Sequence, residues 1–400
     1  MTEPGAGPSA EAGGTPRAPG FPVVGVVGGG QLARMMAQPA IALGIGLRVL
    51  ATGASESAAQ VIGDVRIGRH DDLAALLKFA EGCDVVTFDH EHVPTEYLHE
   101  LQAAGIEVRP GPESLIFAQD KLAMREALTR SGVPCPRWAR IDNRADAVAF
   151  GQRVGWPFIL KTSRGGYDGK GVWQVASAEQ VDSLLTSSTL PAGAAWLGEE
   201  KVEFVAELSA QVARSPHGQA VAYQLVRTVQ RDGVCSEVIA PAPGVGLDRV
   251  AEAQHIAMSV AGSLGVVGML AVELFDTGDR LLVNELAMRP HNSGHWSIEG
   301  ADTSQFENHL RAVLDLPLGS PSPRSPAAVM VNIMGGDHPD LYRAYLHVMA
   351  RDPGIKVHLY GKEVRPGRKV GHVTALGEEV AVLADRARHA ADFFTGTIDG

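Results

Sequence analysis

A lysine in an apolar run, followed by a glycine-rich turn, is the first feature of the chain that could do chemistry. Lys161 lies in the apolar run 158–162, and residues 165–171, GGYDGKG, lead into a second apolar run. Backbone N–H groups of such a turn can bond phosphate oxygens while a lysine cancels their charge. A buried lysine without a partner would be costly. The segment therefore predicts a flap between two strands that covers phosphates, with a solvated glycine-rich hairpin as the alternative.

This segment is not a Walker A loop. That loop needs four residues between its glycines and a Ser or Thr after its lysine. Here three residues separate Gly165 from Gly169, and Gly171 follows Lys170. We expect the phosphates to be bound in another way.

Two glutamates in a predicted hairpin could hold a metal ion. Glu273 and Glu285 lie in apolar runs on either side of residues 276–279, DTGD. They face one side of the hairpin if the loop is odd in length, or even with a bulge. With a loop over 276–280 they would lie on a diagonal, roughly 7 Å apart between backbones. Mg²⁺ typically takes one or two carboxylates plus phosphate oxygens. We therefore predict a magnesium site rather than a structural pair.

A second glycine loop, GGGQLA over 28–33, lies between an apolar run and a helical stretch. N–H groups at a helix start make an anion site. A dinucleotide site also needs a carboxylate at the end of the next strand. That strand ends at residues 50–53, LATG, without one. The sequence favours a phosphate site without NAD over two alternatives, a plain tight turn and an NAD(P) dehydrogenase.

Two further polar segments are ambiguous on their own. Residues 362–369, KEVRPGRK, carry four cations and one anion, and alone they suggest a solvated turn. His90 and His92 flank Glu91 and could suggest a metal site, although a polar loop near substrate is the favoured interpretation.

These residues need elements to position them, and the pattern predicts an α/β fold, α+β overall. Short apolar runs alternate with helical stretches, which indicates a parallel sheet near the N-terminus. Its strands are expected over 23–27, 47–52, 84–88 and 106–108, and an amphipathic helix over 120–132. The expected domains are a disordered tail (1–20), a Rossmann-like domain (21–119), a central domain (120–318) with a small part (120–197) and a large part (198–318), a linker (319–326) and a C-terminal domain (327–400).

Composition excludes several classes of function. The 400 residues carry a net charge of −11, which argues against bulk binding of nucleic acid or anionic membranes. No apolar run approaches the roughly 18 residues of a membrane span. Three scattered cysteines suit a reducing cytosol. Any anionic ligand must therefore meet local positive charge.

In order and spacing, Lys121, Lys161, the flap, Glu273 and the pair Asn284-Glu285 resemble the ATP-grasp superfamily. More narrowly, the chain resembles the N5-carboxyaminoimidazole ribonucleotide synthetase family. The strings that carry this resemblance run from about residue 24 to 375: GGGQLARM, DHEHV, GGYDGKG, NELAMRPHNSGHW, SQFENHLRA and RPGRKVGH. RPHNSGHW and RPGRKVGH separate this family from other ATP-grasp ligases.

The resemblance implies a fold and a reaction. The fold would have an N-terminal Rossmann-like domain, a two-part ATP-grasp domain and a small C-terminal β-rich domain. In the reaction, ATP phosphorylates bicarbonate to carboxyphosphate, and the carboxyl group passes to the amine of 5-aminoimidazole ribonucleotide, a step of purine biosynthesis. Two Mg²⁺ ions, with Mn²⁺ as a substitute, and a cytoplasmic homodimer are implied as well. The remaining rivals are a formate-dependent or other ribonucleotide ligase and a non-catalytic nucleotide-binding or scaffold protein.

The resemblance also assigns residues. Lys121 and Lys161 would hold phosphates, residues 199–202 would meet adenine, and Glu207 the ribose. The full set expected at ATP is Lys121, Lys161, Gly166, Tyr167, Asp168, Gly169, Lys170, Gly171, Val172, Glu199, Glu200, Lys201, Val202, Glu207, Gln230, Asn284 and Glu285. The ribonucleotide would meet Gly30, Gln31, Glu91, Asp168, Lys170, Lys362, Arg368 and Lys369. Bicarbonate and carboxyphosphate would meet Arg289, His291 and Asn292, and the metal ions Glu273 and Glu285.

Three positions depart from the family pattern. Asp89 stands where Glu is more common, which shortens any contact through that side chain. Gln230 replaces a frequent His near ATP. Ala287 occupies a position where many ATP-grasp enzymes carry an Asn metal ligand, so no ligand is expected there.

Overall fold

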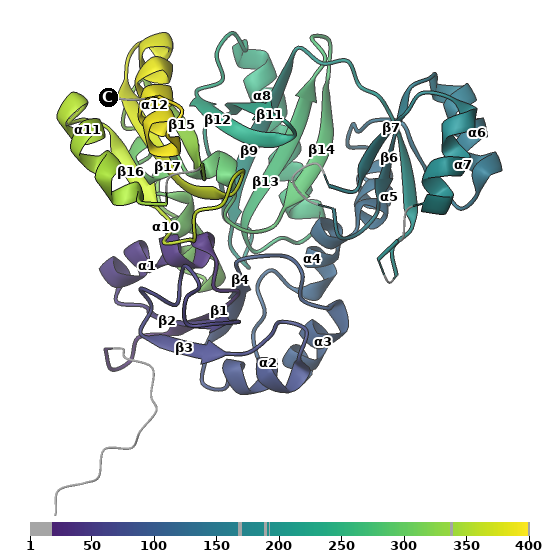
Figure 1. Cartoon of the computed structure of the whole chain (residues 1–400). Helices are drawn as coiled ribbons and strands as arrows, with labels where there is room; N and C mark the ends of the chain where they lie inside the picture. The colour runs from purple at the N-terminus through teal and green to yellow at the C-terminus, as the bar shows by residue number, and fades with distance from the viewer. Residues whose placement is uncertain (1–17, 167–169, 188–189, 192, 337–338, 399–400) are drawn as a thin grey trace, which may run out of the picture.

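The structure, a computed structural model, describes residues 18–166, 170–187, 190–191, 193–336 and 339–398. Within these residues the strands form three sheets, which lie in separate parts of the molecule in Figure 1. None of the described helices combines the length and apolar character needed to cross a membrane.

The first sheet is parallel, as the alternating pattern predicts, in the order β3-β2-β1-β4. Its strands are β1 (Val23–Val27), β2 (Gly46–Ala51), β3 (Asp64–Ile67) and β4 (Val85–Phe88). Its connections and flanks hold α1 (Gln31–Leu43), α2 (Leu73–Ala80), α3 (Thr95–Ala103) and α4 (Pro112–Gln119). The expected strand over 106–108 is wrong: only Val108 forms a single bridge, to Val86.

The second sheet is small and antiparallel, in the order β5-β8-β6-β7. It consists of β5 (Trp138–Ile141), β6 (Phe158–Thr162), β7 (Val172–Val175) and β8 (Trp196–Glu200), with α5 (Lys121–Arg130), α6 (Arg144–Val154) and α7 (Ala178–Ser187). Helix α5 matches the predicted helix, and the Asp120 carboxylate caps it by accepting from Leu122 and Ala123 N–H. Strands β6 and β7 pair antiparallel around the glycine-rich turn.

The third sheet has nine strands, and the C-terminal strands continue it instead of forming a separate sheet. The order is β14-β13-β9-β11-β12-β15-β17-β16, with β10 beside β9. The strands are β9 (Ala206–Arg214), β10 (Ala220–Ala222), β11 (Val226–Arg231), β12 (Val234–Ala240), β13 (Gly268–Asp276), β14 (Leu281–Ala287), β15 (Ala327–Met334), β16 (Lys356–Leu359) and β17 (Lys369–Gly377). The proline-rich segment 319–326 thus leads into a strand that pairs directly with β12.

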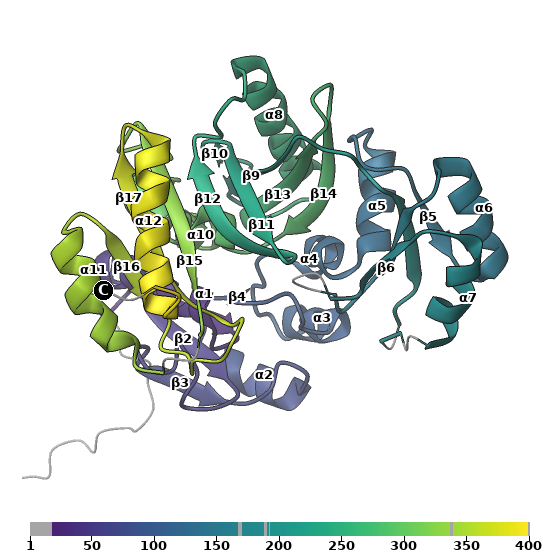
Figure 2. The same cartoon turned by 45° about the horizontal axis from the view of Figure 1, so that its top comes forward.

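Helices cover this sheet and tie it to the first one. They are α8 (Leu247–Ser263), α9 (Ser297–Gly300), α10 (Gln305–Val313), α11 (Ala344–Arg351) and α12 (Val380–Thr395), with 3₁₀ turns at Asn292–Gly294 and Leu341–Arg343. Figure 2 shows α12 lying along β15 and β17. Helix α10 packs against α1, and the His309 ring bonds both Thr87 Oγ1 (2.8 Å) and Met269 N–H (3.1 Å). This histidine joins β4 to β13.

Candidate active site

A cavity of about 920 Å³ is lined by residues of the small sheet and of the nine-stranded sheet. We call it the first cavity. It brings together most side chains expected at ATP, bicarbonate and metal, from both sheets and from α5. Those lining it are Lys121, Lys161, Gly166, Val172, Glu199, Glu200, Lys201, Val202, Glu207, Gln230, Glu273, Asn284, Glu285, Arg289, His291 and Asn292, and Glu91, expected at the ribonucleotide, lines it as well.

Part of the expected flap is not placed at this cavity. Tyr167, Asp168 and Gly169 lie outside the described residues. Lys170 and Gly171 are described, but neither lines the first cavity. The described ends of the turn, Gly166 and Val172, do line it.

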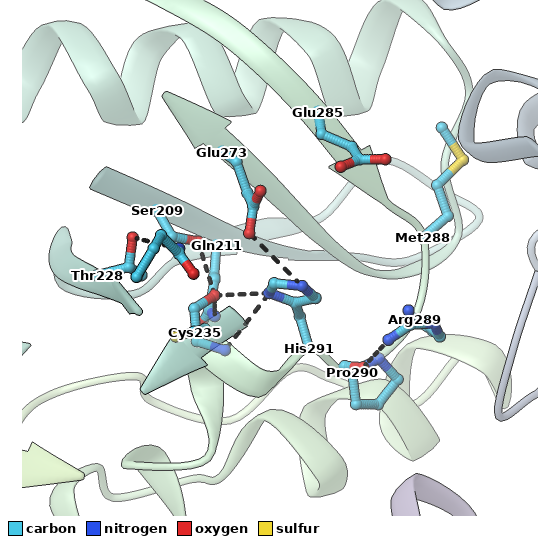
Figure 3. A network of polar contacts seen from close by, with 12 residues as sticks. Ser209, Gln211, Thr228, Cys235, Glu273, Glu285, Met288, Arg289, Pro290 and His291 are labelled. Atoms are coloured by element: carbon cyan, nitrogen blue, oxygen red, sulfur yellow. Dashed lines mark hydrogen bonds and ion pairs between the residues drawn. The ribbon is translucent and has the colours of Figure 1, made fainter. Parts of the chain in front are cut away.

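The two hairpin glutamates are direct cross-strand partners. Glu273 on β13 pairs with Glu285 on β14, and the register shifts just after Glu273. Because the loop of 277–280 is even in length, this bulge is what places both side chains on one face. Of the arrangements that the sequence left open, the even loop with a bulge is confirmed and the diagonal one is wrong. Figure 3 shows the two carboxylates side by side on their strands.

The environment of this pair suits a hard cation. Burial and the charges of Glu285 and Glu207 raise the pKa of Glu273 to about 8. The Glu285 side chain is half-exposed at the cavity; partial desolvation opposes its ionisation, but the Lys121 ammonium bonds it and its pKa is lowered. The described residues hold no cluster of three or more His, Cys, Asp or Glu that could enclose a metal alone. Two carboxylates in a cavity for phosphates fit Mg²⁺, which keeps water and phosphate ligands.

Lys161 already has a protein partner, so its charge is balanced before any phosphate binds. Its ammonium lies 2.7 Å from Glu199 Oε2, and it approaches Asn284 Oδ1 at 3.4 Å. Glu199 Oε1 accepts at 2.6 Å from Arg125 Nε. Burial alone would raise the pKa of Glu199, but Arg125 and Lys161 outweigh it and lower the pKa to about 2.

Arg125 is a functional candidate that the sequence interpretation missed. Its side chain is fully buried, and it also donates to the backbone carbonyls of Val283 (2.9 Å) and Asn284 (2.7 Å). A signal for it exists in the sequence: Arg125 lies three residues from both Leu122 and Leu128, on the buried face of α5. An arginine at such a position indicates a buried charge network.

The segment after β14 supplies further polar groups. Arg289 Nε donates to Glu91 Oε2 at 2.8 Å, and Met288 N–H donates to Glu91 Oε1. Burial, with Arg289 and Lys369 nearby, lowers the pKa of His291 to about 3, so its ring is neutral near pH 7. His291 Nε2 lies 3.7 Å from Glu273 Oε1, as Figure 3 shows. Asn292 Nδ2 is buried and finds no oxygen acceptor among the described residues.

Glu207, the expected ribose contact, lies beside Gln230, one of the three departures from the family pattern. Burial raises the pKa of Glu207, and the Gln230 side chain bonds its carboxylate. Both line the first cavity. Gln230 therefore faces the place assigned to the nucleotide, although it replaces a frequent His. Ala287 also lines the cavity and offers no ligand atom.

A second cavity, of about 790 Å³, lies between the glycine loop over 28–33 and the loop before β17. Gly30, Gln31, Lys362 and Arg368 line it, and Lys362 Nζ bonds Gln31 Oε1. Lys369, expected in the same phosphate grip, instead lines the first cavity. The structure therefore divides the basic segment 362–369 between two cavities.

Asp89, one of the three departures from the family pattern, limits which N–H groups at the start of α1 are available to a ligand. Its carboxyl accepts at 2.8 Å from Ala33 N–H at the start of α1, and burial raises its pKa. A Cβ on Gly30 would stand 2.1 Å from Asp89 Oδ2, so a larger residue at this position would displace the Asp89 carboxyl. Because Asp89 already occupies the first turn of α1, a phosphate would have to use the N–H groups of Gly30 and Gln31.

A carboxylate does approach the glycine loop, although none follows β2 directly. Glu56 lies five residues past the end of β2, and a Cβ on Gly29 would stand 2.2 Å from its Oε2. It lines the second cavity. The spacing rule missed it because the intervening turn folds back over the loop.

Among the described residues, His90 alone lines both cavities. Its ring stacks on His92 with centroids 5.2 Å apart and meets His70 edge-on at 4.7 Å. Burial, with His70 and His92 nearby, lowers the pKa of His90 to about 3. The described parts of these two cavities therefore adjoin at a neutral imidazole.

Three family models match the chain in succession. They are a ribonucleotide synthetase preATP-grasp domain (residues 22–119), an ATP-grasp domain (126–306) and a phosphoribosylaminoimidazole carboxylase C-terminal domain (328–386).

Curated relatives and solved structures agree with these models. The N5-carboxyaminoimidazole ribonucleotide synthase of Mycobacterium tuberculosis is 53% identical, over 94% of this chain and 88% of its own. The crystal structure of the synthetase from Thermus thermophilus has a TM-score of 0.84 at 37% identity, covering 94% and 99% of the two chains. The synthase from Aspergillus clavatus, in complex with ADP and 5-aminoimidazole ribonucleotide, has a TM-score of 0.85 at 31% identity and covers 94% and 99%. With its two cavities and its ATP-grasp fold, the chain belongs to the N5-carboxyaminoimidazole ribonucleotide synthase family.

Proposed function

We propose that the chain carboxylates the amine of 5-aminoimidazole ribonucleotide, using ATP and bicarbonate and releasing ADP and phosphate, in purine biosynthesis. The observation that supports this most is the pair of adjoining cavities. One holds lysines and paired glutamates suited to a triphosphate and its metal, and the other holds separate cations suited to a monophosphate. Family membership points to the same reaction and argues against an NAD(P) dehydrogenase.

ATP would bind in the first cavity, where residues from both sheets meet. Lys121 and Lys161 would neutralise its phosphates, while Glu207 would accept from the ribose hydroxyls. Residues 199–202, which line this cavity, would meet adenine. Preorganised charges of this kind stabilise a transferring phosphoryl group more than the ground state.

Glu273 and Glu285 would hold two Mg²⁺ ions, with Mn²⁺ as a substitute. Bound there, the ions would offset the charge that develops on the phosphate oxygens. The raised pKa of Glu273 supports this role, since a cation would replace the proton that burial otherwise favours.

Bicarbonate would lie beside Arg289, His291 and Asn292. Arg289 is fixed by Glu91, and its guanidinium can donate to a carbonate or carboxyphosphate oxygen. The Asn292 amide has no oxygen acceptor among the described residues and can donate as well. His291, neutral near pH 7, can bond an oxyanion through one ring nitrogen while Ser293 fixes the other.

The ribonucleotide would bridge the cavities at His90. Its 5′-phosphate would bind in the second cavity to Lys362, Arg368 and the N–H groups of Gly30 and Gln31. Glu91, and the flap residues Asp168 and Lys170, would contact the sugar and base, and Lys369 would face the carboxyl donor. With the flap closed over this junction, carboxyphosphate would be shielded from water.

Further features of the proposal follow from family resemblance. We expect a cytoplasmic homodimer and the domain boundaries 21–119, 120–318 and 327–400. Size-exclusion chromatography with light scattering would measure the oligomeric state.

Phosphate release from ATP tests the proposed function. Release should require Mg²⁺ and should rise strongly only when both 5-aminoimidazole ribonucleotide and bicarbonate are present. If the two compounds fail to stimulate release, the assignment falls. Replacing bicarbonate by formate separates a carboxylase from a formate-dependent ligase, because only the latter would keep its activity.

A further inference from the structure

A buried chain of three charges stands behind the phosphate lysine. Arg125 Nε bonds one oxygen of Glu199 at 2.6 Å, and Lys161 Nζ lies 2.7 Å from the other. The Glu199 side chain is only 3% exposed. Each of its oxygens is engaged by a cation.

The two cations differ in their freedom to move. Arg125 is fully buried, and two carbonyls of β14, those of Val283 and Asn284, hold the rest of its guanidinium. Lys161 is 14% exposed, lines the first cavity and has a flexible four-carbon stem. Only the lysine can turn toward a ligand.

This difference matters when a nucleotide binds. If the Lys161 ammonium turns to phosphate oxygens, it gives up part of its contact with Glu199. A buried carboxylate left without a cation is strongly unfavourable. With Arg125 in place, Glu199 keeps a charge-assisted hydrogen bond and Lys161 is released at little cost.

We propose that Arg125 is a positioning residue that keeps Glu199 neutralised so that Lys161 can transfer between this carboxylate and the phosphates of ATP. Without Arg125, Glu199 would depend on Lys161 alone and would compete with the nucleotide for it. The inference rests on the proposed ATP site in the first cavity. It adds a residue from α5 that need not touch the nucleotide.

The test compares ADP binding, measured by isothermal titration calorimetry with Mg²⁺, across the wild type and four variants of the full chain. The variants are Arg125→Met, Glu199→Gln, the double variant that combines them, and Arg130→Met. Arg130 is exposed in the last turn of the same helix and provides the matched control. Circular dichroism and thermal melting show which variants are folded.

We expect Arg125→Met to bind ADP roughly tenfold to hundredfold more weakly, the range for one hydrogen bond to a charged group. The double variant should recover to within about threefold of the wild type, because a neutral amide in place of the carboxylate no longer holds the lysine. Glu199→Gln alone should bind ADP at least as tightly as the wild type, and Arg130→Met should bind equally. A merely structural role for Arg125 would give no such rescue.

Two results would overturn the inference: a double variant that binds as weakly as Arg125→Met, or an Arg125→Met variant that binds like the wild type. If Arg125→Met does not fold, Glu199→Gln alone decides the question, and a loss of ADP affinity in it would refute the release of Lys161. These failures differ from failure of the proposed function, in which the wild type itself would bind no ADP.

Discussion

The two cavities handle charge in opposite ways. In the first cavity the two lysines expected at the ATP phosphates are mostly buried and each is bonded to a carboxylate, Lys121 to Glu285 and Lys161 to Glu199. In the second cavity the basic residues lie on a loop, where Arg368 is exposed and Lys362 is half-buried. Proteins need preorganised, desolvated charges to lower a reaction barrier, whereas exposed cations are sufficient to capture a phosphate. The first cavity is therefore suited to catalysis, and the second to binding a phosphate.

The largest expected effect is a loss of turnover when the charge of Glu285, one of the two paired glutamates of the first cavity, is removed. Glu285→Gln removes a proposed metal ligand and the partner of Lys121, so turnover should fall by at least about a thousandfold. Steady-state phosphate release measures it. Asp279→Asn, an exposed carboxylate in the same hairpin, is the control and should keep its activity. Activity near the wild-type value in Glu285→Gln would contradict the metal role.

The second cavity should respond in affinity more than in rate. Arg368→Met should raise the KM for 5-aminoimidazole ribonucleotide about tenfold with little change in kcat, because an exposed phosphate contact is lost. Added salt should narrow the difference from the wild type, since exposed charges are screened. Arg343→Met, exposed and remote from both cavities, is the control. An equal loss in kcat would mean that the second cavity contributes to catalysis as well as to binding.

The pH dependence of stability tests the buried ion pairs of Glu199 in the first cavity. The pKa of Glu199 is depressed to about 2 in the folded protein, so its contribution to stability is present above the ordinary value near 4.5. That contribution should be lost, by about 1 kcal/mol per pH unit, as the pH falls from 4.5 toward 2. Urea unfolding should therefore show Glu199→Gln with a flatter acid dependence than the wild type.

The control for the pH series is Glu203→Gln, whose side chain is 87% exposed. It should follow the wild-type acid dependence. Identical slopes for the wild type and Glu199→Gln would show that the buried ion pairs do not persist in solution.

The smallest effect concerns Asp89, which caps α1 beside the second cavity. Asp89→Ala should lower the free energy of unfolding by about 1 kcal/mol, the usual cost of losing a cap. Asp89→Asn should cost less, because its amide oxygen can still accept from Ala33 N–H. Urea denaturation of both variants checks this order, and equal losses would mean that the acid itself is required.

Most residues of the first cavity could be predicted from the sequence, but the ion pairs between them could not. Glu273 and Glu285 could be placed on one hairpin because their separation is local. Lys161 was correctly expected in a strand, but its partner Glu199 lies on β8, and the strand order β5-β8-β6-β7 cannot be predicted from local spacing. Arg125 was missed because a helical arginine is usually solvated.

The second cavity shows a different limit. The glycine loop and the basic segment 362–369 are more than 300 residues apart, and only family resemblance could join them. They meet because β17 extends the nine-stranded sheet, which places the loop before it against α1. The same long-range geometry sends Lys369 to the first cavity. Chain position alone cannot indicate which face of a distant strand a residue will occupy.

A crystal structure with Mg²⁺, ADP and 5-aminoimidazole ribonucleotide tests the division of the two cavities most directly. The account predicts ADP phosphates beside Lys121 and Lys161, and the ribonucleotide phosphate beside Gln31, Lys362 and Arg368, with the aminoimidazole ring next to His90. A ribonucleotide phosphate bound in the first cavity, or ADP bound at the glycine loop over 28–33, would contradict it.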